Sequence, residues 1–132
     1  MPYAMREQLL NDTAVVIGAS ETDTPVTDKI SITAADATDG MIIDITASSV
    51  TDAGADSSII AKLQSRYSAT GGWEDSKTVV IAGNDTYTIK LLPQVSGDQQ
   101  YLPLRPEIRV VVSSGAGDAA TISSVRVSRL EK

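Results

Sequence analysis

The sequence predicts an all-β protein, a single-domain β-sandwich or jelly roll of about eight short antiparallel strands with an N-terminal arm. Short segments in which apolar and polar residues alternate recur along the chain, as expected for half-buried strands. Loops rich in Gly, Asp, Ser and Pro separate these segments. β-Branched residues and threonine are plentiful, and no long helical periodicity interrupts the pattern.

The length of 132 residues is typical of one domain, which is enough chain to build a real hydrophobic core. Phenylalanine is absent, and the aromatic residues are one Trp and four Tyr. The core must therefore consist of Ile, Val, Leu and Ala. We expect residues 1–13 to form the arm and residues 14–132 to form the sandwich.

The pattern predicts individual strands in the following order along the chain. They are Ala14–Gly18, Lys29–Thr33, Met41–Ala47, Ile59–Tyr67, Thr78–Ala82, Thr86–Leu92, Ile108–Val112 and Thr121–Leu130. Loops are expected between them, including one over 68–77, and "GNDT" at 83–86 indicates a compact hairpin.

The alternation also predicts which side chains face the core. Ile59, Ala61 and Leu63 point one way, and Ile108, Val110 and Val112 do the same in a later strand. Tyr87, Ile89 and Leu91 share a face of another strand. In the last strand, Ile122 and Val125 are out of phase by one position, which predicts a β-bulge or twist.

Two prolines stiffen the segment before the seventh predicted strand, in "YLPLRPEIRVVV". Proline fixes φ and donates no backbone hydrogen bond, so Pro103 and Pro106 belong at a strand entrance or a sheet edge. Leu102 and Arg105 precede prolines and are biased toward extended backbone. The segment is predicted to be a rigid, extended lead-in.

The charge is −6 and unevenly distributed: residues 1–58 hold ten acidic and two basic side chains, and residues 59–132 hold seven and nine. An acidic chain is poorly matched to nucleic acid. The longest apolar runs are far shorter than the ~20 residues that span a bilayer. No secretory signal is recognisable at the start, so we expect synthesis in the cytoplasm and no membrane contact.

The absence of histidine and cysteine excludes disulfides, Ser-His-Asp and Cys-His nucleophiles, and His- or Cys-based zinc sites. Aspartates cluster at Asp36, Asp39 and Asp44, and again at Asp52 and Asp56. A glycosidase needs two carboxyl groups across a groove, and calcium needs several oxygen ligands. The "DATDG" stretch lacks EF-hand spacing, so turn chemistry is the favoured interpretation. We expect no catalytic residue, no metal and no cofactor.

Trp73 follows Gly71 and Gly72 in a predicted loop. Three interpretations are open. The indole could be a sugar-stacking platform, although the chain has few aromatic side chains to assist it. It could cover one end of the core, or it could anchor a protein contact, where tryptophan is enriched.

Several segments together resemble a known family. An arm with Gln8 and Leu9 leads into a Thr/Asp-rich segment, and "DGMIIDIT", "DAGADSSIIAKLQSR", "YLPLRPEIRVVV", "GAGDAAT" and "ISSVRV" follow. This layout is similar to the small capsid cement, or decoration, proteins of tailed bacteriophages. The resemblance implies a jelly-roll-like β fold on the outer shell of the phage head, often as trimers at local threefold positions. It implies no catalytic residues.

We therefore expect a virion structural protein, not an enzyme, made in the host cytoplasm. It would clamp the major capsid protein and act as a homotrimer. The side chains expected to contact partners are Tyr3, Met5, Leu9, Trp73, Tyr101 and Arg105.

Three alternatives are weighed against this expectation. The first is another virion module of the tail, collar or fibre. The second is a carbohydrate-binding module that uses Trp73 and Tyr67. The third, and remote, alternative is an inverting glycosidase that uses Asp44 or Asp56.

Overall fold

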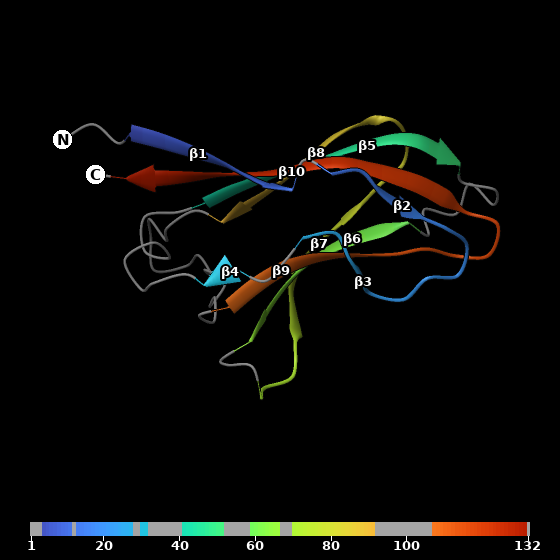
Figure 1. The fold of residues 1–132 in the computed structure, drawn as a ribbon, viewed down its shortest axis with the longest axis horizontal. Coiled ribbons are helices and arrows are strands. Elements are labelled where there is room, and N and C mark those ends of the chain that lie inside the picture. The colour runs from blue at the N-terminus through green and yellow to red at the C-terminus, as the bar shows by residue number, and fades with distance from the viewer. Residues whose placement is uncertain are drawn as a thin grey trace, which may run out of the picture.

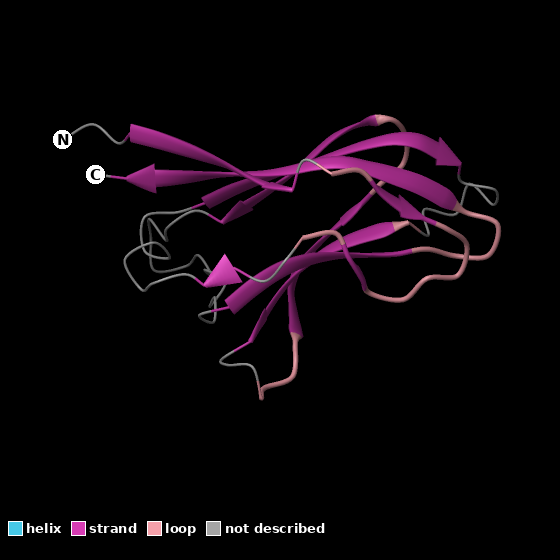
Figure 2. Cartoon of the chain, viewed as in Figure 1, coloured by secondary structure: helices cyan, strands magenta, loops and turns pink. Residues whose placement is uncertain are grey.

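The computed structural model describes residues 4–11, 13–27, 30–31, 41–51, 59–66, 70–91 and 107–131. These residues form strands and loops, and no helix occurs among them (Figure 2). The strands are β1 (Ala4–Asn11), β2 (Val15–Ile17), β3 (Thr24–Pro25), β4 (Ile30–Ser31), β5 (Met41–Thr51), β6 (Ile60–Arg66), β7 (Glu74–Val80), β8 (Asp85–Leu91), β9 (Glu107–Ser113) and β10 (Ala119–Glu131).

Two antiparallel sheets face each other as the layers of a sandwich (Figure 1). Sheet A has the order β1-β10-β5-β8, with β2 also paired to β10. Sheet B has the order β3-β9-β6-β7, with β4 also paired to β9. The prediction of an all-β sandwich is confirmed.

The strand order among the described residues is that of a jelly roll. β1 and β2 pair with successive parts of β10, and β3 and β4 pair with successive parts of β9. Each couple thus fills one edge position, like a single interrupted strand. If β1 with β2 counts as the first strand and β3 with β4 as the second, β5 to β10 are the third to the eighth. Sheet A then has the strand order first, eighth, third, sixth, and sheet B has the order second, seventh, fourth, fifth. Such interleaving is the arrangement of double-sheet jelly rolls.

The core lies between the sheets and consists of aliphatic side chains, as the absence of phenylalanine requires. Ile59, Ala61 and Leu63 are fully buried, and so is the predicted set on β9. From sheet A, alternate residues of β5 and β10 meet them. The buried cluster consists of Ile17, Val26, Ile43, Ile45, Ala47, Ile59, Ala61, Leu63, Ile81, Ile89, Ile108, Val110, Val112, Ala120, Ile122, Val125 and Val127.

The bulge predicted in the last strand is confirmed. The pairing of β10 with β5 shifts register between Ile122 and Ser124, so Ser123 is the extra residue. One inserted residue moves every later side chain to the opposite face. This is how both Ile122 and Val125 reach the core. The Ser123 hydroxyl hydrogen-bonds the Ser48 hydroxyl at 2.9 Å.

The hairpin predicted at 83–86 is wrong, because this segment carries the chain from one sheet to the other. β7 belongs to sheet B, whereas β8 pairs with β5 in sheet A. The Tyr87 hydroxyl accepts hydrogen bonds from the backbone N–H groups of Ala82 and Gly83 and donates to the carbonyl of Gly83. A tyrosine bonded a few residues upstream is a known corner device of Greek-key sandwiches. The three hydrogen bonds of the Tyr87 hydroxyl stabilise this connection between the two sheets, at a segment whose sequence is typical of a hairpin turn.

The predicted loop over 68–77 is also too long, because β7 begins at Glu74. Polar side chains pair this part of β7 with β6: Gln64 Nε2 donates to Asp75 Oδ1 at 2.9 Å, and the hydroxyls of Ser65 and Ser76 lie 3.0 Å apart. The pattern had no apolar alternation here, so it did not indicate a strand. Cross-strand polar pairs supply the stabilisation instead.

The segment predicted as an N-terminal arm contains β1. Its backbone pairs with β10 from Ala4 opposite Glu131 to Asn11 opposite Val125, so the first and last described residues lie side by side (Figure 1). The proline-containing lead-in with Pro103 and Pro106 lies outside the described residues. In the described part of the chain, no helix has the length and hydropathy needed to cross a membrane.

Candidate functional site

The structure describes the surroundings of one predicted contact residue, Trp73. Tyr3, Tyr101 and Arg105 lie outside the described residues. Met5 and Leu9 lie on β1, opposite Leu130 and Arg126 of β10 in sheet A. Trp73 instead precedes β7 in sheet B, so these residues belong to different layers. The partner-contact roles of all six residues stay predictions.

Trp73 lies on the outer face of sheet B beside two arginines. The ring is half-buried and is not part of the hydrophobic core cluster. The guanidinium carbon of Arg66 lies 4.3 Å from the ring centroid, and that of Arg109 lies 4.4 Å from it. Both distances are within the range of cation–π contacts. Arg66, Trp73 and Arg109 are called the arginine–tryptophan cluster below.

The sheet register brings these three side chains together. Arg66 ends β6, and Arg109 lies on the neighbouring strand β9, opposite Gln64. Trp73 comes directly before Glu74, which pairs with Ser65 of β6. Arg66 and Arg109 therefore lie diagonally across adjacent strands on one face, within reach of a large ring from the third strand.

Each arginine makes its hydrogen bond to a described residue through Nε. Arg66 Nε donates to Glu107 Oε1 at 2.9 Å, and Arg109 Nε donates to Gln64 Oε1 at 2.9 Å. Among the described residues, no carboxylate lies within 4.0 Å of the Arg109 guanidinium. Burial, and then repulsion by Arg66, lowers the pKa of Arg109, while Asp23 acts in the opposite direction. Arg109 nevertheless stays protonated at neutral pH.

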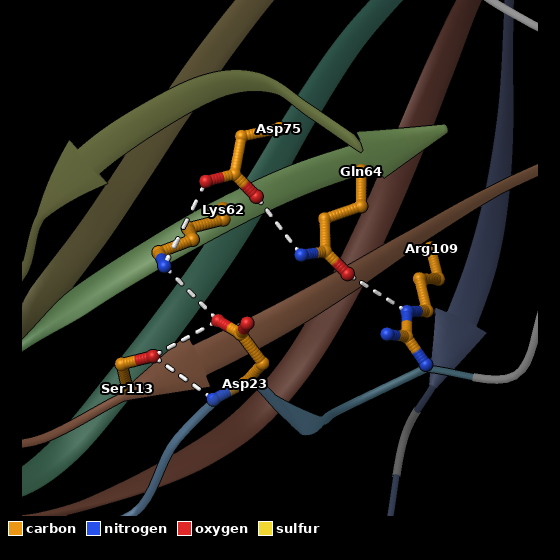
Figure 3. A network of polar contacts seen from close by, with 6 residues as sticks. All are labelled: Asp23, Lys62, Gln64, Asp75, Arg109 and Ser113. Carbon is orange, nitrogen blue, oxygen red and sulfur yellow. Dashed lines mark hydrogen bonds and ion pairs between the residues drawn. The ribbon is translucent and has the colours of Figure 1, made fainter. Parts of the chain in front are cut away.

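Arg109 is also one end of a polar network that crosses sheet B (Figure 3). Gln64, only 4% exposed, bridges Arg109 to Asp75 through its amide. Lys62 Nζ lies 3.0 Å from Asp23 Oδ1 and 3.7 Å from Asp75 Oδ2. The polar network, defined as Asp23, Lys62, Gln64, Asp75, Arg109 and Ser113, ties three strands to the loop before β3.

That loop is held at Asp23, which has a positive φ of 47°. Aspartate is among the few residues that adopt this conformation without a large penalty. Its backbone N–H donates to Ser113 Oγ at 2.9 Å, and the same hydroxyl donates to Asp23 Oδ1 at 3.1 Å. The hydrogen bond from Lys62 is the main cause that lowers the pKa of Asp23, and the same bond raises the pKa of Lys62.

The outer face of sheet B also buries an apolar residue. Val111 alternates with the core residues Val110 and Val112, yet it is fully buried. Its register partners are Pro25 on β3 and Lys62 on β6. Long charged side chains cover apolar surface with their methylene stems while their heads stay polar. The face is thus a second packed layer as well as a set of charges.

Charge is unevenly shared along this face. At one end, the carboxylates of Asp23 and Asp75 share the single cation Lys62. At the other end, Arg66 and Arg109 are adjacent to one described carboxylate partner, Glu107. The arginine–tryptophan cluster is therefore locally positive, although the whole chain has a charge of −6.

The alternation that turns Ile59, Ala61 and Leu63 toward the core also places Lys62, Gln64 and Arg66 on the opposite face, but it does not indicate that they belong to a polar network. Arg66, Arg109 and Gln64 were not identified as candidates. The available signal was the presence of long side chains at alternate positions of two strands, beside the only tryptophan. The partner strands, however, were not deducible from local pattern.

The aspartates considered for catalysis or calcium lie elsewhere. Asp44, on β5, accepts a hydrogen bond from Thr88 Oγ1 at 2.6 Å in an exposed position. Asp36, Asp39, Asp52 and Asp56 lie outside the described residues. Within the described ranges, no three acidic side chains are grouped so as to hold a metal ion.

Trp73 packs against two arginines on the outer face of sheet B, an arrangement that none of the three interpretations of this residue included. A guanidinium about 4 Å from the ring centroid occupies space over the indole that a stacked sugar would need. The sequence matches no model of a known protein family, and no curated protein matches it.

Proposed function

We propose that this chain is a capsid decoration protein, which binds the major capsid protein on the outer surface of a phage head and stabilises the shell as a homotrimer. The proposal combines the family resemblance of the sequence with the jelly-roll sandwich. Because one fold hosts many unrelated functions, the fold alone does not carry the proposal.

The observation that carries it is the arginine–tryptophan cluster on the outer face of sheet B. Tryptophan and arginine are the residue types most enriched where partners bind tightly. The ring and both guanidinium groups are already positioned by cross-strand contacts and by the hydrogen bonds that the arginines donate to Glu107 and Gln64. A side chain that is ordered before binding loses less entropy when a partner docks.

The chemistry of the chain is consistent with a role based on contact. The sequence has no histidine or cysteine to act as a nucleophile or a general base near neutral pH. A decoration protein works through many copies on a symmetric lattice. Modest contacts repeated within a trimer strengthen each other through effective concentration.

The direct test mixes purified protein with head shells that lack it. We expect saturable binding in multiples of three copies, and we expect decorated shells to release their contents at a higher temperature than bare shells. Sedimentation quantifies the bound copies, and a dye that reports DNA release gives the temperature. Equal robustness of bare and saturated shells would contradict the proposal.

A location elsewhere on the virion is the second candidate, because the same fold and cluster would serve a tail, collar or fibre module equally well. An epitope-labelled chain imaged on intact particles separates the two. Label confined to the tail would replace the head assignment while keeping the structural role.

A further inference from the structure

We propose that the arginine–tryptophan cluster is the docking site for a carboxylate side chain in an acidic segment of the partner protein. This inference rests on the proposed function, because it names the face and the partner chemistry through which decoration takes place. It assigns the outer face of sheet B as the docking face.

The hydrogen bonding of the two arginines leaves donors available for such a group. Arg66 and Arg109 each use Nε for the bond to Glu107 or Gln64. Within the described ranges, their terminal amino groups donate to no residue. A guanidinium donates best as a planar fork to the two oxygens of a carboxylate. Terminal nitrogens from two arginines beside one ring are suited to such a group.

Local charge favours an anion at this position. The positive charge of Arg66 repels that of Arg109. The hydrogen-bond partner of Arg109 is the neutral amide of Gln64, whereas Lys62 has two carboxylates as partners. An incoming carboxylate relieves the repulsion between the two arginines, because it places a counter-charge beside both of them. Desolvation at the interface strengthens the attraction further.

Charge complementarity points to an acidic protein segment in preference to nucleic acid. Nucleic acid presents long runs of phosphate, and its binding requires extensive cationic surface. This chain has a charge of −6, and Asp23, Asp75 and Glu107 flank the two arginines on the same face. A positive spot of this size matches the carboxylates of a short acidic segment and lacks the extensive cationic surface that a run of phosphates needs.

The test uses the single tryptophan as an internal reporter. The full chain is titrated with a synthetic glutamate-rich peptide with both ends blocked, and Trp73 fluorescence is followed. We expect a saturable change that weakens as salt increases. The peptide with Gln in place of Glu should bind at least about tenfold more weakly, because it lacks the charge.

Two substitutions localise the site. Arg109→Gln should weaken peptide binding by about tenfold or more, and Arg109→Lys should give an intermediate loss, since a lysine keeps the charge but lacks the planar fork. Arg126→Gln, an exposed arginine on β10 of sheet A, is the matched control and should leave binding unchanged. Melting curves verify that each variant is folded.

Several outcomes would overturn the inference. One is equal peptide binding by the wild type and Arg109→Gln. Another is equal binding of the Gln peptide, and a third is competition by inorganic phosphate at the peptide's own affinity, which would mark a simple anion site. Self-association that disappears in Arg109→Gln, without peptide binding, would make a second copy of the chain the partner.

The head-shell assay separates this inference from the proposed function. If wild-type protein and Arg109→Gln bind shells equally, the docking face is wrong and the decoration role stands. If wild-type protein binds no shells, the decoration role fails, and the peptide titration still decides whether the cluster binds a carboxylate.

Discussion

The described polar contacts on the outer faces of the two sheets are of different kinds. On sheet A, short hydroxyl groups make isolated, exposed contacts, such as Thr46 with Thr86 and Thr88 with Asp44. On sheet B, long charged side chains, a buried amide and an indole form one connected layer over Val111. Solvent-facing side chains of sheet B should therefore contribute more to the free energy of unfolding than those of sheet A.

The physical reason is coupling. A hydrogen bond between exposed hydroxyls is exchanged for bonds to water at little net cost. In the polar network, removing one side chain leaves its partners without a hydrogen bond or a counter-charge. Because Gln64 is buried, water cannot take the place of a lost partner there. Substitutions in the polar network of sheet B should therefore lower the free energy of unfolding by more than substitutions at exposed positions of sheet A.

The largest effect is expected for Lys62→Met. This change keeps most of the stem that lies beside Val111 but removes the cation shared by Asp23 and Asp75. Two carboxylates are then left near each other without a counter-charge, and we expect a loss of about 2 kcal/mol in the free energy of unfolding, below the figure for a fully buried pair. Denaturant unfolding followed by circular dichroism measures it.

The control for Lys62→Met is Lys90→Met on β8 of sheet A, where the lysine is exposed. We expect a change of less than about 0.5 kcal/mol there. If both variants lose the same stability, the network on sheet B is not coupled and the comparison fails.

The next effect is expected for Trp73→Ala. The variant removes two cation–π contacts and the surface on which both guanidinium groups pack, which together contribute about 1.5 kcal/mol at a half-exposed site. The unfolding free energy is again measured by circular dichroism, because the variant has no tryptophan. Thr86→Ala on sheet A, with its single exposed hydroxyl contact, should cost far less. Equal losses would contradict a special role for the ring.

The ion pair between Asp23 and Lys62 on sheet B should make stability depend on pH. The pKa of Asp23 is lowered from 3.8, so its contribution is complete above that value and is lost as the pH falls through the folded-state pKa. The pKa of Lys62 is raised from 10.5, so its contribution is complete below that value and is lost as the pH rises through the folded-state pKa.

The stability difference between the wild type and Asp23→Asn should therefore be constant from about pH 5 to about pH 9 and shrink outside this window at both ends. Urea unfolding at a series of pH values measures it. A difference that grows in acid would show that the hydrogen bond from Lys62 does not stabilise the charged form of Asp23.

The smallest effect is expected for Thr88→Val on sheet A. The substitution removes the exposed bond to Asp44, and a β-branched residue is retained on the strand. We expect a change within about 0.5 kcal/mol by thermal unfolding. The neighbouring Tyr87→Phe provides the scale: its hydroxyl bonds three backbone groups, and its loss should cost about 1.5 kcal/mol. A larger loss for Thr88→Val than for Tyr87→Phe would reverse the assignment.

Much of the fold was predictable because it depends on local alternation. The inward faces of β6 and β9 follow from a period of two, and the bulge at Ser123 follows from the single break in that period on β10. The part of β7 before Thr78 does not follow from the sequence, because Glu74, Asp75 and Ser76 show no apolar alternation and their pairing depends on polar side chains of β6.

The candidate site was predictable only in part, because its residues are brought together by long-range pairing. Trp73 was identified by residue type alone. Arg66 and Arg109 are more than 40 positions apart, and only the antiparallel pairing of β6 with β9 places them on one face. The crossover at Gly83 was missed for a related reason: a short Gly-Asn-Asp segment is compatible with either a hairpin or a change of sheet, and the Tyr87 hydroxyl decides between them.

The pairing of Ala4 with Glu131 has a mechanical consequence. A force that pulls these two residues apart would break the backbone hydrogen bonds between β1 and β10 one after another, so each hydrogen bond resists the load alone. Force that enters through the broad side of sheet B is instead shared by neighbouring strands. If this chain reinforces a pressurised shell, its ends are a poor place to attach the load and its flank is a good one.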